Sequence, residues 1–265
     1  MRAAANAADV AEGRFVQGVC VKVLPSAAAA ERHVAALFAE QLRRKPDSVL
    51  GLATGGTPVG VYRALVAAHR AGEADLGRAR TFNLDEYAGL APDHPQSYAA
   101  YMRQHLFDHV NLPPERTHLP DGGVADAAVA CRLYDALYRH YGPADLQLLG
   151  IGLNGHIGFN EPGFAPAPGG THVVRLDEST RQANARFFGA GETVPEYALT
   201  MSAGRIMQAR SIVLLATGAA KAAIVARALE GPIGTDCPAS LLQLHPDATV
   251  VLDREAAGEL APERG

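Results

Sequence analysis

Short apolar stretches alternate with segments of helical periodicity along nearly the whole chain. The stretches expected to form strands cover residues 19–24, 49–53, 80–84, 146–151, 171–176, 211–216 and 248–252. Between them, apolar residues recur three or four positions apart, as they do on the buried side of a helix. Residues 146–151 are apolar at almost every position, which is typical of a parallel strand covered on both faces. The pattern therefore predicts the α/β class, with a doubly wound, mostly parallel sheet and helices on both of its faces.

One domain accounts for the length and composition. The chain has 265 residues, of which 48% are hydrophobic and 20% charged, a mixture that can bury a sizeable core. No shift in composition divides it, so we expect a single domain over residues 18–253. Residues 1–17 begin with an alanine-rich run that lacks the apolar stretch of a secretory signal, and we expect a flexible N-terminal extension there. Residues 254–265 are expected to form a polar C-terminal tail.

Charge, hydropathy and cysteine usage exclude several classes of protein. The formal net charge of −4 argues against a general nucleic-acid binder. No window approaches the roughly 18 apolar residues of a membrane span, so we expect no membrane partner. The three cysteines are far apart and show neither metal spacing nor a disulfide framework, which fits a reducing compartment. A soluble cytoplasmic protein is the expectation.

The loop after the second expected strand is rich in turn-forming residues. Thr54, Gly55, Gly56 and Thr57 precede a helix expected to begin at Pro58, with Thr57 as its N-cap. Paired glycines let the backbone approach a ligand, and the free N–H groups at a helix start favour an anion. There is no Gly-x-Gly-x-x-Gly and no lysine after the glycines, so this is neither a nucleotide fingerprint nor a P-loop. The loop is either a phosphate-binding loop or a tight strand-to-helix connection.

Chemically active side chains follow the ends of other expected strands, where open parallel sheets bind their ligands. These residues, together with one from the helical segment 179–188, are Asp85, Asn154, His156, Glu161, Lys221 and Arg186. A carboxylate can remove a proton alpha to a carbonyl, and a histidine supported by a glutamate can move protons on a ring oxygen near neutral pH. Two cations can complete a phosphate site. The set suggests proton-transfer chemistry on a small phosphorylated molecule.

Each candidate also has an ordinary structural explanation. Asp85 can cap a helix, His156 can be a satisfied loop histidine, and Glu161 can be a surface loop residue. Arg186 and Lys221 can be solvated helix residues. The other histidines have no paired spacing, and no pattern such as His-Glu-x-x-His occurs, so we expect no metal site.

Five sequence blocks resemble, in the same order, those of the glucosamine-6-phosphate deaminase family. They read LATGGTP at 52–58, FNLDEY at 82–87, GLNGHIGFNEP at 152–162, STRQANARFF at 179–188 and LQLHP at 242–246, and the resemblance extends over roughly residues 19–253. It implies a Rossmann-like sheet and an amino-sugar phosphate as the small-molecule substrate. The implied reaction converts glucosamine 6-phosphate and water to fructose 6-phosphate and ammonia, in N-acetylglucosamine catabolism. The family needs no metal, nucleotide or other cofactor for it.

The resemblance also implies roles for the candidate residues. The base that removes the proton at C2 and returns one at C1 falls on Asp85. The ring-opening group falls on His156, assisted by Glu161. Asn154 replaces a relay residue that is Asp in some relatives; because an amide does not ionise, we expect Asn154 to orient His156 by hydrogen bonding. The residues implied to hold the phosphate are Gly55, Gly56, Thr57, Arg186 and Lys221.

Two departures from allosteric relatives concern regulation. The loop 163–170, expected to be mobile, contains no Lys or Arg, whereas those relatives carry basic residues there. The chain also stops soon after its last expected strand, without their longer helical tail. We therefore expect no activation by N-acetylglucosamine 6-phosphate, and a monomer or a small homo-oligomer.

Three other functions remain open on the sequence alone. A 6-phosphogluconolactonase-type hydrolase would use a similar loop, although the blocks at 82–87 and 152–162 favour the deaminase. Galactosamine-6-phosphate deaminase differs only at C4 of the sugar, on which these blocks do not report. A sugar-phosphate sensor would need a DNA-binding module, and the roughly 18 residues before the first expected strand are too few for one.

Overall fold

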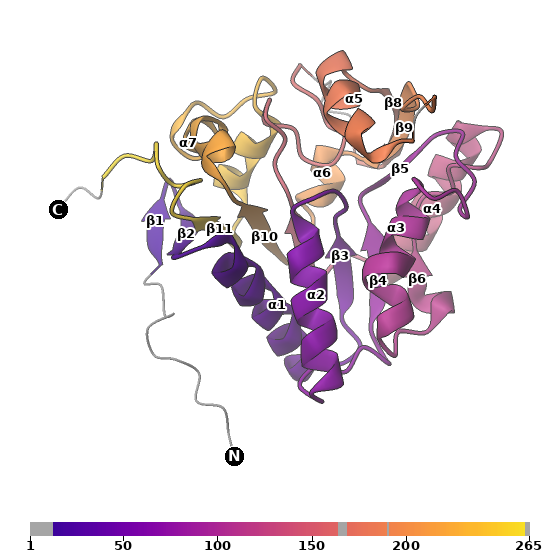
Figure 1. Ribbon diagram of the computed structural model, residues 1–265, viewed down its shortest axis with the longest axis horizontal. Helices are drawn as coiled ribbons and strands as arrows, with labels where there is room; N and C mark the ends of the chain where they lie inside the picture. The colour runs from indigo at the N-terminus through magenta and orange to yellow at the C-terminus, as the bar shows by residue number, and fades with distance from the viewer. Residues whose placement is uncertain (1–12, 164–168, 190, 263–265) are drawn as a thin grey trace.

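A mostly parallel sheet forms the centre of the protein in a computed structural model that describes residues 13–163, 169–189 and 191–262 (Figure 1). Its strand order is β1-β2-β11-β10-β7-β3-β4-β6, and only β1 and β2 pair antiparallel. The chain builds β3, β4 and β6 in one direction, then returns to β7 and builds β10 and β11 in the other. This topology confirms the expected doubly wound α/β fold. The strands are β1 (Arg14–Val16), β2 (Val19–Leu24), β3 (Val49–Leu52), β4 (Arg80–Asn83), β6 (Thr117–His118), β7 (Leu146–Leu149), β10 (Ser211–Ala216) and β11 (Ala248–Asp253).

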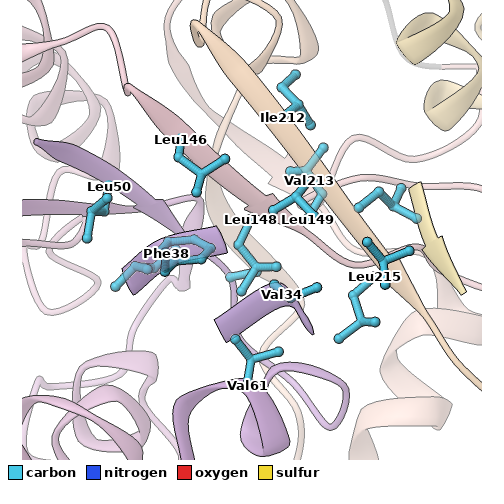
Figure 2. Close-up of a cluster of buried hydrophobic side chains, with 14 of the residues drawn as sticks. Val34, Phe38, Leu50, Val61, Leu146, Leu148, Leu149, Ile212, Val213 and Leu215 are labelled. Atoms are coloured by element: carbon cyan, nitrogen blue, oxygen red, sulfur yellow. The ribbon is translucent and has the colours of Figure 1, made fainter. Parts of the chain in front are cut away.

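Helices cover both faces of this sheet. Side chains alternate along a strand, so Phe82 faces away from its neighbour Thr81, whose partner in β3 is Leu50. On the Leu50 side, apolar side chains of α1 and α2 meet those of the strands (Figure 2). On the Phe82 side lie the rings of Tyr134 and Tyr138 from α4. The helices are α1 (Ala27–Arg44), α2 (Pro58–Arg70), α3 (Tyr98–His105), α4 (Ala127–Tyr141), α5 (Glu178–Asn184), α6 (Ala203–Ile206) and α7 (Ala222–Glu230), with 3-10 turns η2 (Phe107–His109), η3 (Pro114–Arg116), η4 (Ala185–Phe187), η5 (Ala219–Lys221) and η6 (Pro238–Leu244).

A second sheet of three antiparallel strands was not expected. It consists of β5 (Asp85–Tyr87), β9 (Tyr197–Met201) and β8 (Thr171–Arg175), in the order β5-β9-β8. The middle strand β9 is buried at four of its five positions, so it lacks the alternating pattern that reveals a half-exposed strand. Figure 1 shows this sheet and α5 together at the top right of the molecule, beyond the carboxyl ends of β3 and β4.

One residue joins the two sheets. The N–H of Leu84 donates to the carbonyl of Leu52 in β3, at 3.2 Å, and the carbonyl of Leu84 accepts from the N–H of Met201 in β9, at 2.8 Å. Asp85 follows immediately and belongs to the small sheet. The chain therefore changes sheets directly before its candidate base.

The structure also moves two of the expected boundaries. Residues 14–16, placed in the flexible extension, form β1 and pair with β2 because a turn at Gln17 and Gly18 folds the chain back. Past residue 253 the chain is not simply a solvated tail, since Ala256 is fully buried. Residues 1–12, most of the loop 163–170 (residues 164–168) and residues 263–265 lie outside the described residues. Within the described residues, no helix has both the length and the apolar character needed to cross a bilayer.

Candidate active site

A cleft of about 450 Å³ lies at the carboxyl ends of the parallel strands. Its walls come from the segments after β3, β7 and β10, from the start of β5, and from α5 with η4. Glu161 lies behind the wall, with Oε2 3.2 Å from Nδ1 of His156. The other predicted site residues all line the cleft: Thr54, Gly55, Gly56, Thr57, Asp85, Asn154, His156, Arg186 and Lys221.

The glycine loop turns sharply between β3 and α2. Gly55 has φ +99°, a conformation that L side chains rarely adopt. Thr57 was predicted to cap α2 with its side chain, but its backbone is already helical and its hydroxyl makes no capping bond. The reason is that the glycines complete the turn before Thr57, so that Thr57 enters the helical conformation itself. The Tyr101 hydroxyl holds the loop from α3 by donating to the Gly55 carbonyl at 2.7 Å.

Two cations stand beside this loop. A methyl group built on Gly56 would lie 3.8 Å from a guanidinium nitrogen of Arg186, which approaches from η4. Lys221, at the end of η5, donates from Nζ to the carbonyl of Ile151 at 2.6 Å. Burial and the neighbouring Arg186 lower the pKa of Lys221 below its usual value. Like charges placed this close are stabilised by an anion between them, as expected for a phosphate site.

Asp85 also lines the cleft and is almost fully buried, with 5% of its surface exposed. Burial and the adjacent Glu86 carboxylate raise the pKa of Asp85 to about 8, against an opposing hydrogen bond from Thr54. A methyl group on Gly158 would lie 3.5 Å from Oδ2 of Asp85, so the loop after β7 passes close to this carboxylate. A carboxyl group with a pKa near neutral is suited to accept and return a proton.

His156 and Glu161 form the second titratable pair of the cleft. The His156 ring lies against the backbone at Gly152, where any added methyl group would sit about 2.3–2.5 Å from ring atoms. Glycine at this position is therefore what lets the imidazole occupy its place. Burial raises the pKa of Glu161, but hydrogen bonding and charge from His156 and bonds from Thr180 and Asn154 outweigh it, and the net pKa is lowered.

Asn154 acts mainly on Glu161. Its Nδ2 donates to Oε2 of Glu161 at 2.7 Å, and its Oδ1 accepts from the backbone N–H of His156 at 3.2 Å. Asn154 thus makes the expected hydrogen bond to His156 at its backbone N–H. It acts on the imidazole ring only indirectly, through the Glu161 carboxylate. Thr180 of α5 donates to the other oxygen of Glu161 at 2.7 Å.

Several residues of the cleft were not among the predicted ones. The block 179–188 contributes Ser179, Thr180 and Asn184 to the cleft, whereas only Arg186 of this block was predicted as a site residue. Tyr98, at the start of α3, also lines the cleft. Over the described part of the chain, no cluster of three or more His, Cys, Asp or Glu side chains is arranged to hold a metal ion.

Comparison with known families gives a match over most of the chain. The profile of the glucosamine-6-phosphate isomerases and 6-phosphogluconolactonases matches residues 25–251. A glucosamine-6-phosphate deaminase of Rhodopirellula baltica is 53% identical over 244 residues, which cover 92% of this chain and 96% of that protein.

Two solved structures show the same fold at different levels of sequence identity. A monomeric glucosamine-6-phosphate deaminase superposes with a TM-score of 0.87 at 47% identity, covering 90% of this chain and 99% of the other. A 6-phosphogluconolactonase from Trypanosoma brucei superposes with a TM-score of 0.75 at 21% identity, covering 91% and 98%. The second likeness concerns the fold alone.

Proposed function

We propose that this chain, which belongs to the family of glucosamine-6-phosphate isomerases and 6-phosphogluconolactonases, is an enzyme that deaminates glucosamine 6-phosphate. The reaction takes up water and yields fructose 6-phosphate and ammonia through an aldose–ketose isomerisation. Relatives that are about 50% identical to this chain are named glucosamine-6-phosphate deaminase. The match to the Rhodopirellula baltica protein covers nearly the whole length of both chains.

The observation that carries the proposal is the distribution of charge along the cleft. The glycine loop, Arg186 and Lys221 stand together, and Asp85 and His156 line the same cavity. A sugar phosphate bound with its phosphoryl group on the loop has its other end available to the two titratable groups. The cleft therefore suits proton transfer on a phosphate-anchored sugar.

Asp85 is the proposed base. In the open-chain aldehyde form, the hydrogen at C2 is acidic because it lies alpha to the C1 carbonyl. The buried carboxylate removes it and delivers a proton at C1, while the aldehyde oxygen becomes a hydroxyl and an imine forms at C2. Asp85 is buried and lies beside Glu86, so its ionised form is a stronger base than an exposed aspartate. Deamination follows when water adds to the imine carbon C2 and ammonia leaves, which gives the ketone.

His156 is the proposed group for opening the sugar ring. A proton delivered to the ring oxygen breaks its bond to C1, and a proton leaves the C1 hydroxyl. Glu161 holds Nδ1 of the imidazole, and Asn154 and Thr180 hold Glu161. This leaves the Nε2 edge of the ring for the substrate.

A substrate panel with two readouts tests the proposal. Glucosamine 6-phosphate and galactosamine 6-phosphate are assayed for ammonia release, and 6-phosphogluconolactone for hydrolysis. We expect ammonia from glucosamine 6-phosphate, with a higher kcat/KM than for any other compound. Lactone hydrolysis without ammonia release would overturn the proposal, and preference for the galacto compound would change the substrate.

Assembly, regulation and location belong to the same proposal. The structural relative described above is monomeric, which supports a monomer or a small homo-oligomer. We also propose that the protein acts without nucleic-acid or membrane partners. We further propose a cytoplasmic enzyme that N-acetylglucosamine 6-phosphate does not activate. A sigmoidal rate curve that becomes hyperbolic on adding that compound would contradict this.

A further inference from the structure

Glu86 is a buried carboxylate that no step of the proposed reaction uses. It follows Asp85 on β5 and is 2% exposed. Because side chains alternate along a strand, Glu86 points away from the cleft that Asp85 lines. Its carboxylate accepts hydrogen bonds from backbone groups, and no Lys or Arg side chain among the described residues pairs with it, which is unusual for a buried acidic residue.

Three backbone N–H groups donate to this carboxylate. Oε1 accepts from Tyr87 at 2.8 Å and from Tyr98 at 2.9 Å, and Oε2 accepts from Ala99 at 2.9 Å. Tyr98 and Ala99 form the first turn of α3, whose N–H groups have no partner within the helix. Glu86 therefore joins the N-terminus of α3 to the strand that carries Asp85.

Helix α3 in turn contacts both working parts of the cleft. Tyr98 lines the cleft and stacks on Phe159, with ring centroids 6.0 Å apart. One turn later, the Tyr101 hydroxyl donates to the Gly55 carbonyl of the glycine loop. A continuous path thus runs from Glu86 through the first turn of α3 to the phosphate loop.

We propose that Glu86 is a positioning residue that fixes Asp85, α3 and the glycine loop in one arrangement and, when ionised, places a negative charge beside the proposed base. The proposal rests on the proposed function for its kinetic consequences. The carboxylate charge matters because a neighbouring anion disfavours ionisation of Asp85, which makes Asp85 a stronger base. The N–H groups of α3 stabilise the charge on Glu86 itself.

Other groups also act on this pair of carboxylates. Burial is the largest influence on both, and it raises the pKa of Glu86 to about 7 despite its three backbone hydrogen bonds. The titratable and charged groups around them are Asp121, Tyr62, Tyr87, Tyr98 and Tyr134, and, lining the cleft with Asp85, His156, Lys221 and Arg186. Substitution of Glu86 leaves all of these in place.

Variants at Glu86 separate charge from anchoring. Glu86→Gln removes the charge and presents an amide N–H₂ to one of the three donors, and Glu86→Asp keeps the charge but shortens the reach. We expect Glu86→Gln to lower kcat/KM about tenfold or more, since bonds to a charged group are lost. Its acidic limb of kcat/KM against pH should move to lower pH, while Glu86→Asp should leave that limb in place.

Two matched variants complete the design. Tyr101→Phe cuts the path at the loop without changing charge, and should raise KM with the acidic limb unmoved. Glu86→Gln and Tyr101→Phe should each weaken the binding of fructose 6-phosphate. Because both act on one path, the fold-loss of affinity in the double variant should be smaller than the product of the two single fold-losses. Asp145 is a buried carboxylate at the opposite end of the strands, and Asp145→Asn is the control. It should change neither kcat and KM nor the hydrogen exchange of the glycine loop.

Amide hydrogen exchange of the free protein tests the same path without any substrate. In Glu86→Gln the amides of Tyr98, Ala99 and Gly56 should exchange faster, and in Asp145→Asn they should not. Unchanged exchange at these amides, or lost activity with an unmoved acidic limb, would overturn the inference. If the wild-type protein releases no ammonia, the proposed function is wrong. The hydrogen-exchange experiment then still tests whether Glu86 is coupled to the glycine loop through α3.

Discussion

The two sheets contribute different parts of the cleft. The large sheet is parallel and covered by helices, and the glycine loop and Lys221 follow its strands β3 and β10. The small sheet is antiparallel, starts with Asp85, and is continuous in sequence with α5 through β8. We therefore expect the loops of the large sheet to hold the phosphate together with Arg186 from the small unit, while the small unit supplies the proposed base Asp85 and, through Thr180, a hydrogen bond to Glu161. Changes in the large sheet should therefore act on substrate affinity, and changes in the small unit on turnover.

The largest effect is expected from Asp85→Asn in the small sheet. The amide cannot accept the C2 proton, so kcat should fall by about 10²–10⁴-fold. Exchange of the C2 hydrogen with solvent deuterium, followed by NMR, should disappear while fructose 6-phosphate still binds. Persistent C2 exchange would remove Asp85 from the role of base.

The counterpart in the large sheet is Lys221→Ala. Loss of a charged partner for the phosphate should raise KM by roughly 10- to 100-fold, with a much smaller change in kcat. Lys45→Ala is the control, because Lys45 pairs with Asp145 at the far end of the strands. If Lys221→Ala lowered kcat and left KM unchanged, the division between the sheets would be wrong.

A smaller effect is expected from Thr180→Val in α5. The variant keeps the shape but removes the donor to Glu161, so kcat should fall by about fivefold to tenfold. Losing that bond also raises the pKa of Glu161, which should move its limb of the rate profile to higher pH. Thr180→Ser retains the hydroxyl and should behave like the wild type in both measurements.

The smallest effect concerns stability rather than rate. The folded protein holds the pKa of Asp85 near 8, whereas an unfolded aspartate titrates near 4. The contribution of Asp85 to stability is therefore full below about pH 4 and is lost as the pH rises toward 8, since the unfolded chain ionises first. Asp85→Asn lacks this penalty, so its melting temperature should exceed that of the wild type at pH 8 and equal it at pH 4. An equal difference at both pH values would contradict the buried, protonated state.

The large sheet could be predicted from the sequence because its signals are local. The segments 19–24 and 211–216 form strands with those bounds, and Ser26, a residue type that favours helix starts, caps α1 with its side chain. The charged candidates also converge, since the carboxyl ends of parallel strands share one edge. These features depend on apolar runs and on caps of a few residues.

The small sheet could not be predicted because it depends on contacts between distant segments. β5 and β9 are more than 100 residues apart in the chain, and β5 has only three residues. The roles of Glu86 and Thr180 were missed for the same reason, because their partners lie in other elements. The conformation of Thr57 depends on how the glycines turn, which residue preferences alone do not determine.

Because Leu84 bonds to both sheets, a tilt of the small sheet about this residue would leave Asp85 almost in place. It bonds to both sheets and precedes Asp85 directly, so it is a natural axis for such a rotation. Adjacent Cα atoms are about 3.8 Å apart, so a rotation of about 10° about this axis shifts the Asp85 backbone by roughly 0.7 Å. The far end of the same unit, where α5 and Arg186 lie, travels several times further for the same angle. Such a rotation would widen the cleft on the side of α5 and Arg186 and leave Asp85 in place.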